Sequence, residues 1–211
     1  MKWGKKTATI KTLSILILLI LLLSTYTATA SASASADKIG DYVLNGGVGN
    51  WGYSTRNYYI TSSASSYASI IQDAMDSWIY TTSRLGVSTS ISWSRTYTQS
   101  SSYMDFYYGQ YFTSNTLAAT SFWLYQTQIN PAAQNWGWGK IQLNQSPTTT
   151  GGFNNLSAFN KQGTAAHEIG HVFGLDDTNT ITSSIMCQLG SGRSVKEPQV
   201  CDLVPIQEMY P

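Results

Sequence analysis

The sequence predicts a single α+β domain that follows a short N-terminal leader. Two observations support this class. The predicted order of elements is a strand, a long helix, several strands and then two helices, so both strands and helices build the domain. No repeat, linker or change of composition divides residues 37–211, and a segment of this length is large enough to bury one hydrophobic core.

The first half of the domain contains two predicted strands and one long helix between them. Residues 51–61 are aromatic and β-prone, and predict the first strand. Apolar residues from Tyr67 to Ile79 recur at intervals of three and four, which predicts an amphipathic helix that ends before Gly86. Over 87–94 every second residue is serine, which predicts a strand with one solvated face.

The second half predicts three more strands and a C-terminal helix. The strands are expected at 104–112, 117–126 and 141–143. A polar, glycine-containing loop at 147–155 then leads into the helix described next, and a final helix is expected at about 198–210.

The helix after this loop carries both histidines of the chain, His167 and His171. Residues four apart lie on one helical face, so the two imidazoles point to the same place. Glu168 lies one step around the helix, within reach of a water held there. This is the H-E-x-x-H arrangement of zinc hydrolases, and it predicts one catalytic zinc ion with Glu168 as the general base. The alternative is two surface histidines that bind nothing.

A third zinc ligand is expected after the helix. Gly174 can end the helix in the left-handed conformation and turn the chain sharply. Asp177 follows three residues later, and a carboxylate oxygen is an ordinary third ligand that leaves the fourth position open. Asp176 is the competing candidate. A further alternative is that the Asp-Asp pair only caps a turn and water completes the site.

The whole string, HEIGHVFGLDD, resembles the signature of the metzincin metallopeptidases, H-E-x-x-H-x-x-G-x-x-H. Asp177 stands where that signature has its third histidine, as in the snapalysin-type branch, and the string is also similar to bacterial matrixin-like proteins. Ser184 to Cys187 resembles the Met-turn, which implies that Met186 packs beneath the ligands as an apolar floor. Gln188 occupies the position at which some branches have a tyrosine ligand, so no tyrosine ligand is expected there.

The resemblance implies a fold and an activity. The fold would be a twisted mixed sheet over two helices, with an active-site helix, a Met-turn and a C-terminal helix. The activity would be that of a secreted zinc endopeptidase, with zinc held by His167, His171 and Asp177 and with Glu168 moving the proton. Residues 117–126 are the candidate edge strand that binds substrate as an added strand. Trp136 and Trp138 either rim the cleft or only pack, and no function is assigned to them.

Two other functions remain open on the sequence. A secreted binding or adhesion protein could keep the zinc helix as a structural element, although such a site does not need Glu168. A zinc hydrolase could also act on something other than peptides, but the Met-turn belongs to a peptidase clan.

Residues 1–36 are predicted to be a secretory signal peptide, so the protein is expected to be secreted and extracellular. The segment begins with lysines, continues with an apolar run at 15–23, and ends in small residues with A-x-A sites near Ala36. A retained membrane anchor is the alternative, but the run is shorter than the ~18 residues needed to span a bilayer.

The net charge of the chain without its leader disfavours nucleic acid and anionic membranes as partners. The leader holds four lysines and no acid, so its removal changes the formal charge from +1 to −3. No basic surface is then left to favour nucleic acid or an anionic membrane. The expected partner is a protein or peptide substrate of a monomeric enzyme. No loop has a calcium-binding spacing, so calcium is not predicted.

Cys187 and Cys201 are the only cysteines. In an oxidising compartment such a pair predicts one disulfide, which would join the Met-turn to the last helix. Two free buried thiols are the alternative.

Overall fold

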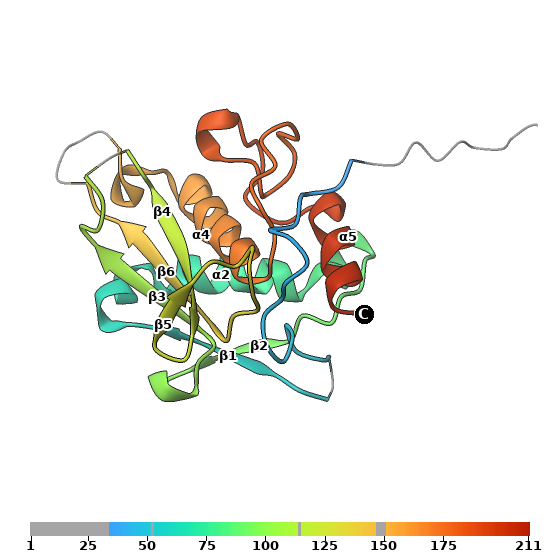
Figure 1. Ribbon diagram of the computed structural model, residues 1–211. Helices are drawn as coiled ribbons and strands as arrows, with labels where there is room; N and C mark the ends of the chain where they lie inside the picture. The colour runs from blue at the N-terminus through green and yellow to red at the C-terminus, as the bar shows by residue number, and fades with distance from the viewer. Residues whose placement is uncertain (1–33, 52, 114, 147–150) are drawn as a thin grey trace, which may run out of the picture. The chain divides into compact units, whose positions relative to one another are not determined.

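The structure is a computed structural model and describes residues 34–51, 53–113, 115–146 and 151–211. Most of the predicted signal peptide, and residues 147–150 of the predicted loop, therefore lie outside the described residues. Residues 34–211 form one compact unit of the α+β class, with one twisted mixed sheet and helices packed on it (Figure 1). The predicted fold class is confirmed.

Six strands form the sheet in the order β2-β1-β3-β6-β4-β5. Strands β2, β1, β3 and β6 run parallel to one another, whereas β4 is antiparallel to β6 and β5 is antiparallel to β4. The strand bounds are β1 Arg56–Ile60, β2 Trp93–Thr96, β3 Met104–Gly109, β4 Ala118–Leu124, β5 Thr127–Ile129 and β6 Trp138–Asn144.

The α-helices of the described residues are α2 Ala68–Ile79, α3 Thr81–Leu85, α4 Ala158–Val172 and α5 Val200–Met209. The short 3-10 helices are η1 Ser62–Tyr67, η2 Gln99–Ser101, η3 Phe153–Asn155 and η4 Leu189–Ser191. The predicted end of the first long helix at Gly86 is confirmed, because Gly86 has the left-handed conformation (φ 70°) that glycine adopts freely. The helix is interrupted once, at Tyr80.

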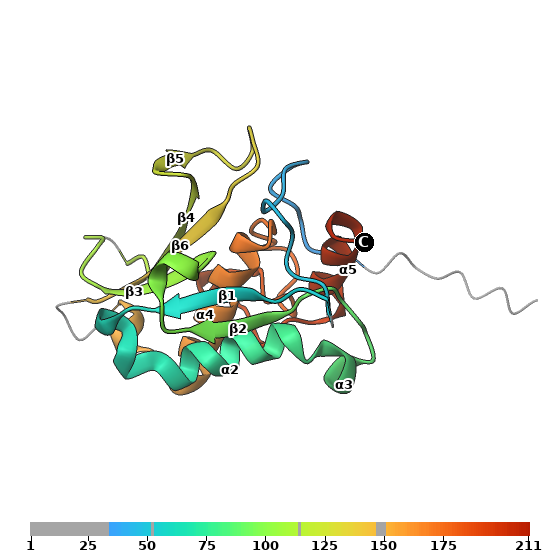
Figure 2. The ribbon, with the colours of Figure 1, turned by 90° about the horizontal axis from the view of Figure 1, so that it is seen from below.

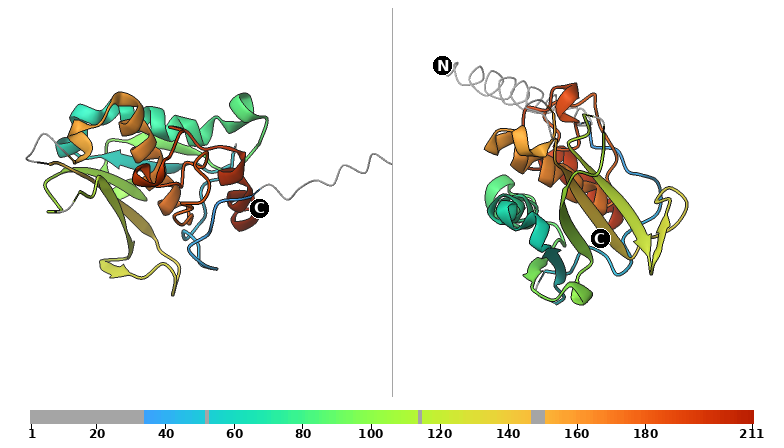
Figure 3. Two further views of the ribbon diagram at one scale, coloured as in Figure 1. Left: turned by 90° about the horizontal axis from the view of Figure 1, so that it is seen from above. Right: turned by 90° about the vertical axis from the view of Figure 1, so that its left-hand side faces the viewer.

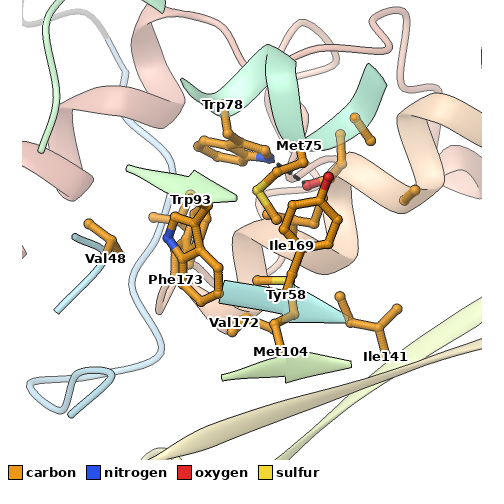
Figure 4. Packing of buried hydrophobic residues seen from close by; sticks show 14 of the residues in the cluster. Val48, Tyr58, Met75, Trp78, Trp93, Met104, Ile141, Ile169, Val172 and Phe173 are labelled. Atoms are coloured by element: carbon orange, nitrogen blue, oxygen red, sulfur yellow. Dashed lines mark hydrogen bonds between the residues drawn. The ribbon is translucent and has the colours of Figure 1, made fainter. Parts of the chain in front are cut away.

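Helices α2 and α4 pack against each other on one face of the sheet, and Figure 2 shows α2 lying along β1 and β2. The parallel register places Tyr58, Met104 and Gly139 in one row. Tyr58 and Met104 are buried in the core, and a Cβ added to Gly139 would meet Val172 of α4. Figure 4 shows the resulting core, in which Trp78 of α2 donates a hydrogen bond of 2.9 Å from Nε1 to the Ala166 carbonyl of α4. The core therefore fixes α4 against both α2 and the sheet.

The strand predicted at 87–94 is wrong in its bounds, since β2 comprises Trp93–Thr96. Val87 and Ser90 of the alternating segment before it bond to residues in or next to helices, whereas the Ser92 carbonyl accepts from the Arg56 amide of β1 at 2.8 Å. The Val87 carbonyl accepts a hydrogen bond from Thr81, and Ser90 donates to the carbonyl of Tyr210 beyond α5. Tertiary contacts have overridden a local period-two pattern here.

The antiparallel part of the sheet also differs from the prediction. No sequence pattern predicts the three-residue β5, which forms a hairpin with β4 that projects beyond the rest of the sheet (Figure 3). Strand β6 is longer than the predicted 141–143. Trp136 lies before it in the core, fully buried, and donates to the Val172 carbonyl at 3.0 Å, as expected for a packing residue.

The beginning and the end of the described chain meet beside α4. Lys38 forms an antiparallel bridge with Leu175, just past the end of α4. Tyr210, which follows α5, donates to the Phe173 carbonyl and accepts from the Leu44 amide. Within the described ranges, no helix is long and apolar enough to cross a membrane.

Candidate metal centre

Helix α4 presents the two histidines side by side at the edge of the core. Ser157 caps its first turn by accepting a hydrogen bond from the Asn160 amide. One turn separates His167 from His171, and their Nε2 atoms lie 3.1 Å apart. The helix therefore brings the two ring nitrogens to a single point, as the spacing predicts.

Backbone carbonyls fix the orientation of both rings. The Nδ1 atom of His167 lies 2.9 Å from the Ile185 carbonyl oxygen, and that of His171 lies 2.8 Å from the Leu175 carbonyl oxygen. A carbonyl can only accept, so each Nδ1 must donate its proton. In the neutral rings each Nε2 then offers a lone pair to the shared point.

The turn after α4 returns Asp177 to this point. Gly174 makes the turn with φ of 99°, and a Cβ there would meet Met209 Sδ at 3.2 Å. Asp177 Oδ1 then lies 3.1 Å from His167 Nε2 and 3.6 Å from His171 Nε2. Asp176 is exposed, and its Oδ1 accepts from the Asp177 amide at 2.8 Å. The structure thus places Asp177 at the histidines and gives Asp176 the capping role.

These three residues form a group that can hold a metal ion. Ligand atoms on a tetrahedral zinc ion are about 3.3 Å apart, given zinc–ligand lengths of about 2.0 Å. The measured separations of 3.1, 3.1 and 3.6 Å are close to that value. Asp177 Oδ1 is buried and has no hydrogen-bond partner. Three acceptors that converge without a proton between them fit a cation.

The pKa values of His167, His171 and Asp177 are shifted in the way expected of a group that attracts one positive charge. Burial lowers the pKa of His167, but Asp177, Glu168 and the Ile185 carbonyl together raise it above the ordinary histidine value. Burial and the neighbouring His167 hold the pKa of His171 below that value. Burial opposes ionisation of Asp177, yet the two imidazoles keep its pKa below the usual range. A proton and a metal ion compete for this centre.

Glu168 is buried beside the group but is not a member of it. The hydroxyl of Thr120, on β4, lies 2.7 Å from Glu168 Oε2 and 3.1 Å from the Glu168 carbonyl oxygen. Thr120 therefore holds one carboxylate oxygen and leaves the other for chemistry. Sequence reasoning missed Thr120, because only the register of β4 on β6 brings it under α4.

Met186, which the sequence predicts as the methionine of a Met-turn, packs against α4. Its side chain is fully buried, and a Cβ added to Gly170 would overlap its Sδ atom. Gly170 lies between the two histidines in sequence, so this close contact places the thioether directly against the ligand-bearing stretch of α4.

A carboxylate, rather than a disulfide, joins the Met-turn to α5. Cys187 and Cys201 are both free thiols, so the expected disulfide is absent from the structure. The neighbouring Asp202 makes the link instead: it accepts from the Ser184 hydroxyl and from the Ile185 amide at 3.0 Å. Asp202 also accepts from the Gln199 amide and so caps α5. Hydrogen bonds of the buried Asp202 therefore join the two segments for which the sequence predicts a disulfide.

Gln188 contacts the candidate third ligand. Its Nε2 donates to Asp177 Oδ2 at 2.6 Å, on the carboxylate oxygen that faces away from the histidines. Asn179 fixes Gln188 in turn, by accepting from its backbone amide at 2.9 Å. Gln188 thus supports Asp177 in this chain.

A depression of about 460 Å³ opens beside His167 and Glu168. Its walls are the residues that lead into β4, the face of α4, and the segment from Gln188 to Arg193. A second depression, of about 390 Å³, lies along α2 and α3 and includes no residue of the candidate metal centre. A substrate bound in the first depression would therefore contact His167 and Glu168.

Strand β4 has one partly open edge next to this depression. Strand β6 pairs along one side of it, whereas β5 pairs only with Phe122–Leu124 on the other side. Within the described residues, Ala118–Ser121 therefore have no strand partner on that side. The predicted edge strand at 117–126 is thus open in its first half and covered in its second.

Comparisons with known proteins add little beyond the fold. No protein-family model matches the chain, and no curated protein does. Solved structures do match, one of them a structure of myroilysin with 13% sequence identity and a TM-score of 0.36. That match covers 60% of this chain and spans half the length of the myroilysin chain. It is a distant similarity in fold.

Proposed function

We propose that this protein is a secreted, monomeric zinc endopeptidase. The observation that carries the proposal is the convergence of His167 Nε2, His171 Nε2 and Asp177 Oδ1, with Glu168 buried beside them. Three protein ligands leave a fourth position open, as in catalytic rather than structural zinc sites. This arrangement disfavours the alternative of a binding or adhesion protein, because a structural zinc site usually has four protein ligands.

In this proposal the two histidines and Asp177 hold the zinc ion. Bound zinc supplies Lewis-acid polarisation of the scissile carbonyl and lowers the pKa of a water toward ~7. Glu168 takes the proton of the attacking water and delivers it to the leaving amine. Thr120 keeps Glu168 in place, with its hydroxyl 2.7 Å from Oε2. No serine or cysteine nucleophile is needed.

The open half of β4 supplies the binding edge. An extended peptide can hydrogen-bond to Ala118–Ser121 as an added strand, which places its backbone across the depression next to Glu168. Because such recognition uses backbone groups, it suits a peptide substrate better than other hydrolase substrates. Secretion rests on the N-terminal sequence, where residues 1–36 have the pattern of a signal peptide.

The Glu168→Gln variant tests the role of the base. The amide keeps the size of the side chain but cannot accept the proton, so turnover should fall by roughly 10²- to 10⁴-fold while bound zinc is retained. The measurements are hydrolysis of a quenched peptide and zinc content by atomic absorption. The matched control is Glu208→Gln, which changes a glutamate on α5 that pairs with Lys38. Full turnover by Glu168→Gln would refute the assignment.

A further inference from the structure

Arg193 places a buried positive charge in the wall of the depression beside the candidate catalytic centre. Its side chain is only 7% exposed, and it lines the same depression as His167 and Glu168. Its Nη2 donates to Thr164 Oγ1 at 3.1 Å. Thr164 lies on α4 one turn before His167, so the guanidinium is anchored on the helical face that carries the metal ligands.

This guanidinium has no ion-pair partner among the described residues. The lysine and arginine ion pairs of these residues join Lys38 to Glu208, and Arg84 and Lys196 to Glu197. Burial lowers the pKa of Arg193 to about 10, and Glu168 opposes that shift. Arg193 is therefore still charged at neutral pH. Glu168 interacts with this charge at longer range but forms no ion pair with it. Burying a charge without an ion pair is costly, so such a residue is a strong candidate for contact with an anionic ligand.

Arg193 is the positively charged residue of the lining, and Glu168 is its negatively charged residue. Besides His167 and Glu168, the other lining residues are uncharged, among them Asn115, Leu117 and Leu189. Glu168 is held toward β4 by Thr120. A planar guanidinium suits a carboxylate, because its parallel N–H groups can bind both oxygens at once.

We propose that this depression binds a carboxylate of the substrate next to the scissile bond, through Arg193. The proposal rests on the peptidase function above and names its substrate class: peptides with an acidic group at the residue whose side chain enters the depression. The carboxylate has two sources, the side chain of Asp or Glu within a peptide, or a free C-terminus close to the cut. A neutral side chain of the same shape, such as Gln in place of Glu, would leave the guanidinium of Arg193 without an ion pair. The site should therefore discriminate against such substrates.

The test is cleavage of a peptide library by the zinc-loaded protein, with cut sites read by mass spectrometry. Asp and Glu should be enriched at one fixed position beside the cut. For a matched pair of peptides with Glu or Gln at that position, kcat/KM should differ by roughly 10- to 100-fold, as expected for one charged hydrogen-bonded contact. A second pair, with a free or an amidated C-terminus, separates the two sources.

Two variants assign the preference to Arg193. Arg193→Gln should abolish the Glu-over-Gln ratio, and Arg193→Lys should keep part of it because the charge remains. The matched control is Lys196→Gln, which removes the same charge from a residue outside this depression and should leave the ratio unchanged. Circular dichroism verifies that each variant is folded, and the wild-type peptide pairs test the proposal without any variant.

The outcomes are distinct. Dependence of cleavage on either carboxylate, lost in Arg193→Gln, supports the proposal. Cleavage with equal rates for Glu and Gln, and for free and amidated ends, overturns this proposal and leaves the peptidase function intact. No cleavage of any peptide by the zinc-loaded protein overturns the peptidase function, and this inference with it.

Discussion

Asp177 is held from two sides, and this defines which of its oxygens faces the histidines. Oδ1 lies 3.1 Å from His167 Nε2, while Oδ2 accepts from Gln188 Nε2 at 2.6 Å. Outer hydrogen bonds of this kind orient a metal ligand and tune its basicity. Gln188 is therefore expected to orient Asp177 toward the histidines.

Gln188→Leu tests this support. The variant removes the donor to Asp177 Oδ2, so the carboxylate can rotate away and zinc affinity should fall by roughly 10- to 100-fold. Competition with a chromophoric chelator measures the affinity. Gln128→Leu, at an exposed position of β5, is the matched control. Equal zinc affinity in the two variants would show that Gln188 has no part in holding Asp177.

The sequence predicts the three site residues on α4, and also Asp177, which the turn after α4 brings to the histidines. His167, Glu168 and His171 follow from a fixed spacing along α4. Thr120 and Arg193 have no such signal, because the register of β4 and the path of the chain after the Met-turn bring them to α4. Their positions depend on tertiary structure, which no local pattern encodes.

At the scale of the elements, α4 packs closely against the segment of Met186 because Gly170 has no side chain. Gly170 has no Cβ, and the space is filled by Met186 Sδ and by Trp78, which a Cβ would meet at 3.1 Å. Glycine normally weakens a helix interior by about 1 kcal/mol relative to alanine. Here packing outweighs that propensity.

Gly170→Ala should therefore destabilise the protein despite the better helix former. Overpacking of a filled core costs about 1–3 kcal/mol, and the helical gain of about 1 kcal/mol offsets only part of it. Urea unfolding followed by circular dichroism measures the difference. The control is Gly190→Ala, where an added Cβ meets nothing within 4 Å. A more stable Gly170→Ala protein would mean that Met186 does not pack against α4 as described.

The sequence predicts elements best where the pattern is long and ends in a definite stop. The helix before Gly86 is such a case, since its periodic apolar residues end at a left-handed glycine. Residues 87–94 show the opposite: their alternation suggests a strand, but contacts with Thr81 and Tyr210 keep most of the segment out of the sheet. Strand β5 has three residues, too few for a period to appear.

At the scale of the whole molecule, Tyr210 joins three distant parts of the chain. Its hydroxyl donates to the Phe173 carbonyl at the end of α4 and accepts from the Leu44 amide near the start of the domain. Burial raises its pKa to about 12. The folded state therefore favours the protonated phenol more strongly than the unfolded state does.

This difference predicts an alkaline loss of stability. The folded pKa lies above the unfolded value, so the contribution is complete below pH ~10 and is lost as the pH rises toward 12. Tyr210→Phe should be less stable by roughly 1–3 kcal/mol at pH 7, because the Leu44 amide loses its partner, and should approach the wild type above pH 11. Urea unfolding at several pH values measures this.

Tyr53→Phe serves as the control for this experiment, since Tyr53 is 91% exposed and should unfold as the wild type does at every pH. A constant stability difference between wild type and Tyr210→Phe from pH 7 to 11.5 would contradict the raised pKa of Tyr210. Equal stability of the two proteins at pH 7 would contradict a role for this phenol in joining the three segments.

The most direct test of the central claim is zinc content measured together with hydrolysis of a denatured protein, with and without a chelator. The convergence of two imidazoles and one carboxylate predicts stoichiometric zinc, cleavage that the chelator abolishes, and recovery when zinc is restored. A protein that binds no zinc, or whose cleavage is indifferent to the chelator, would contradict the account.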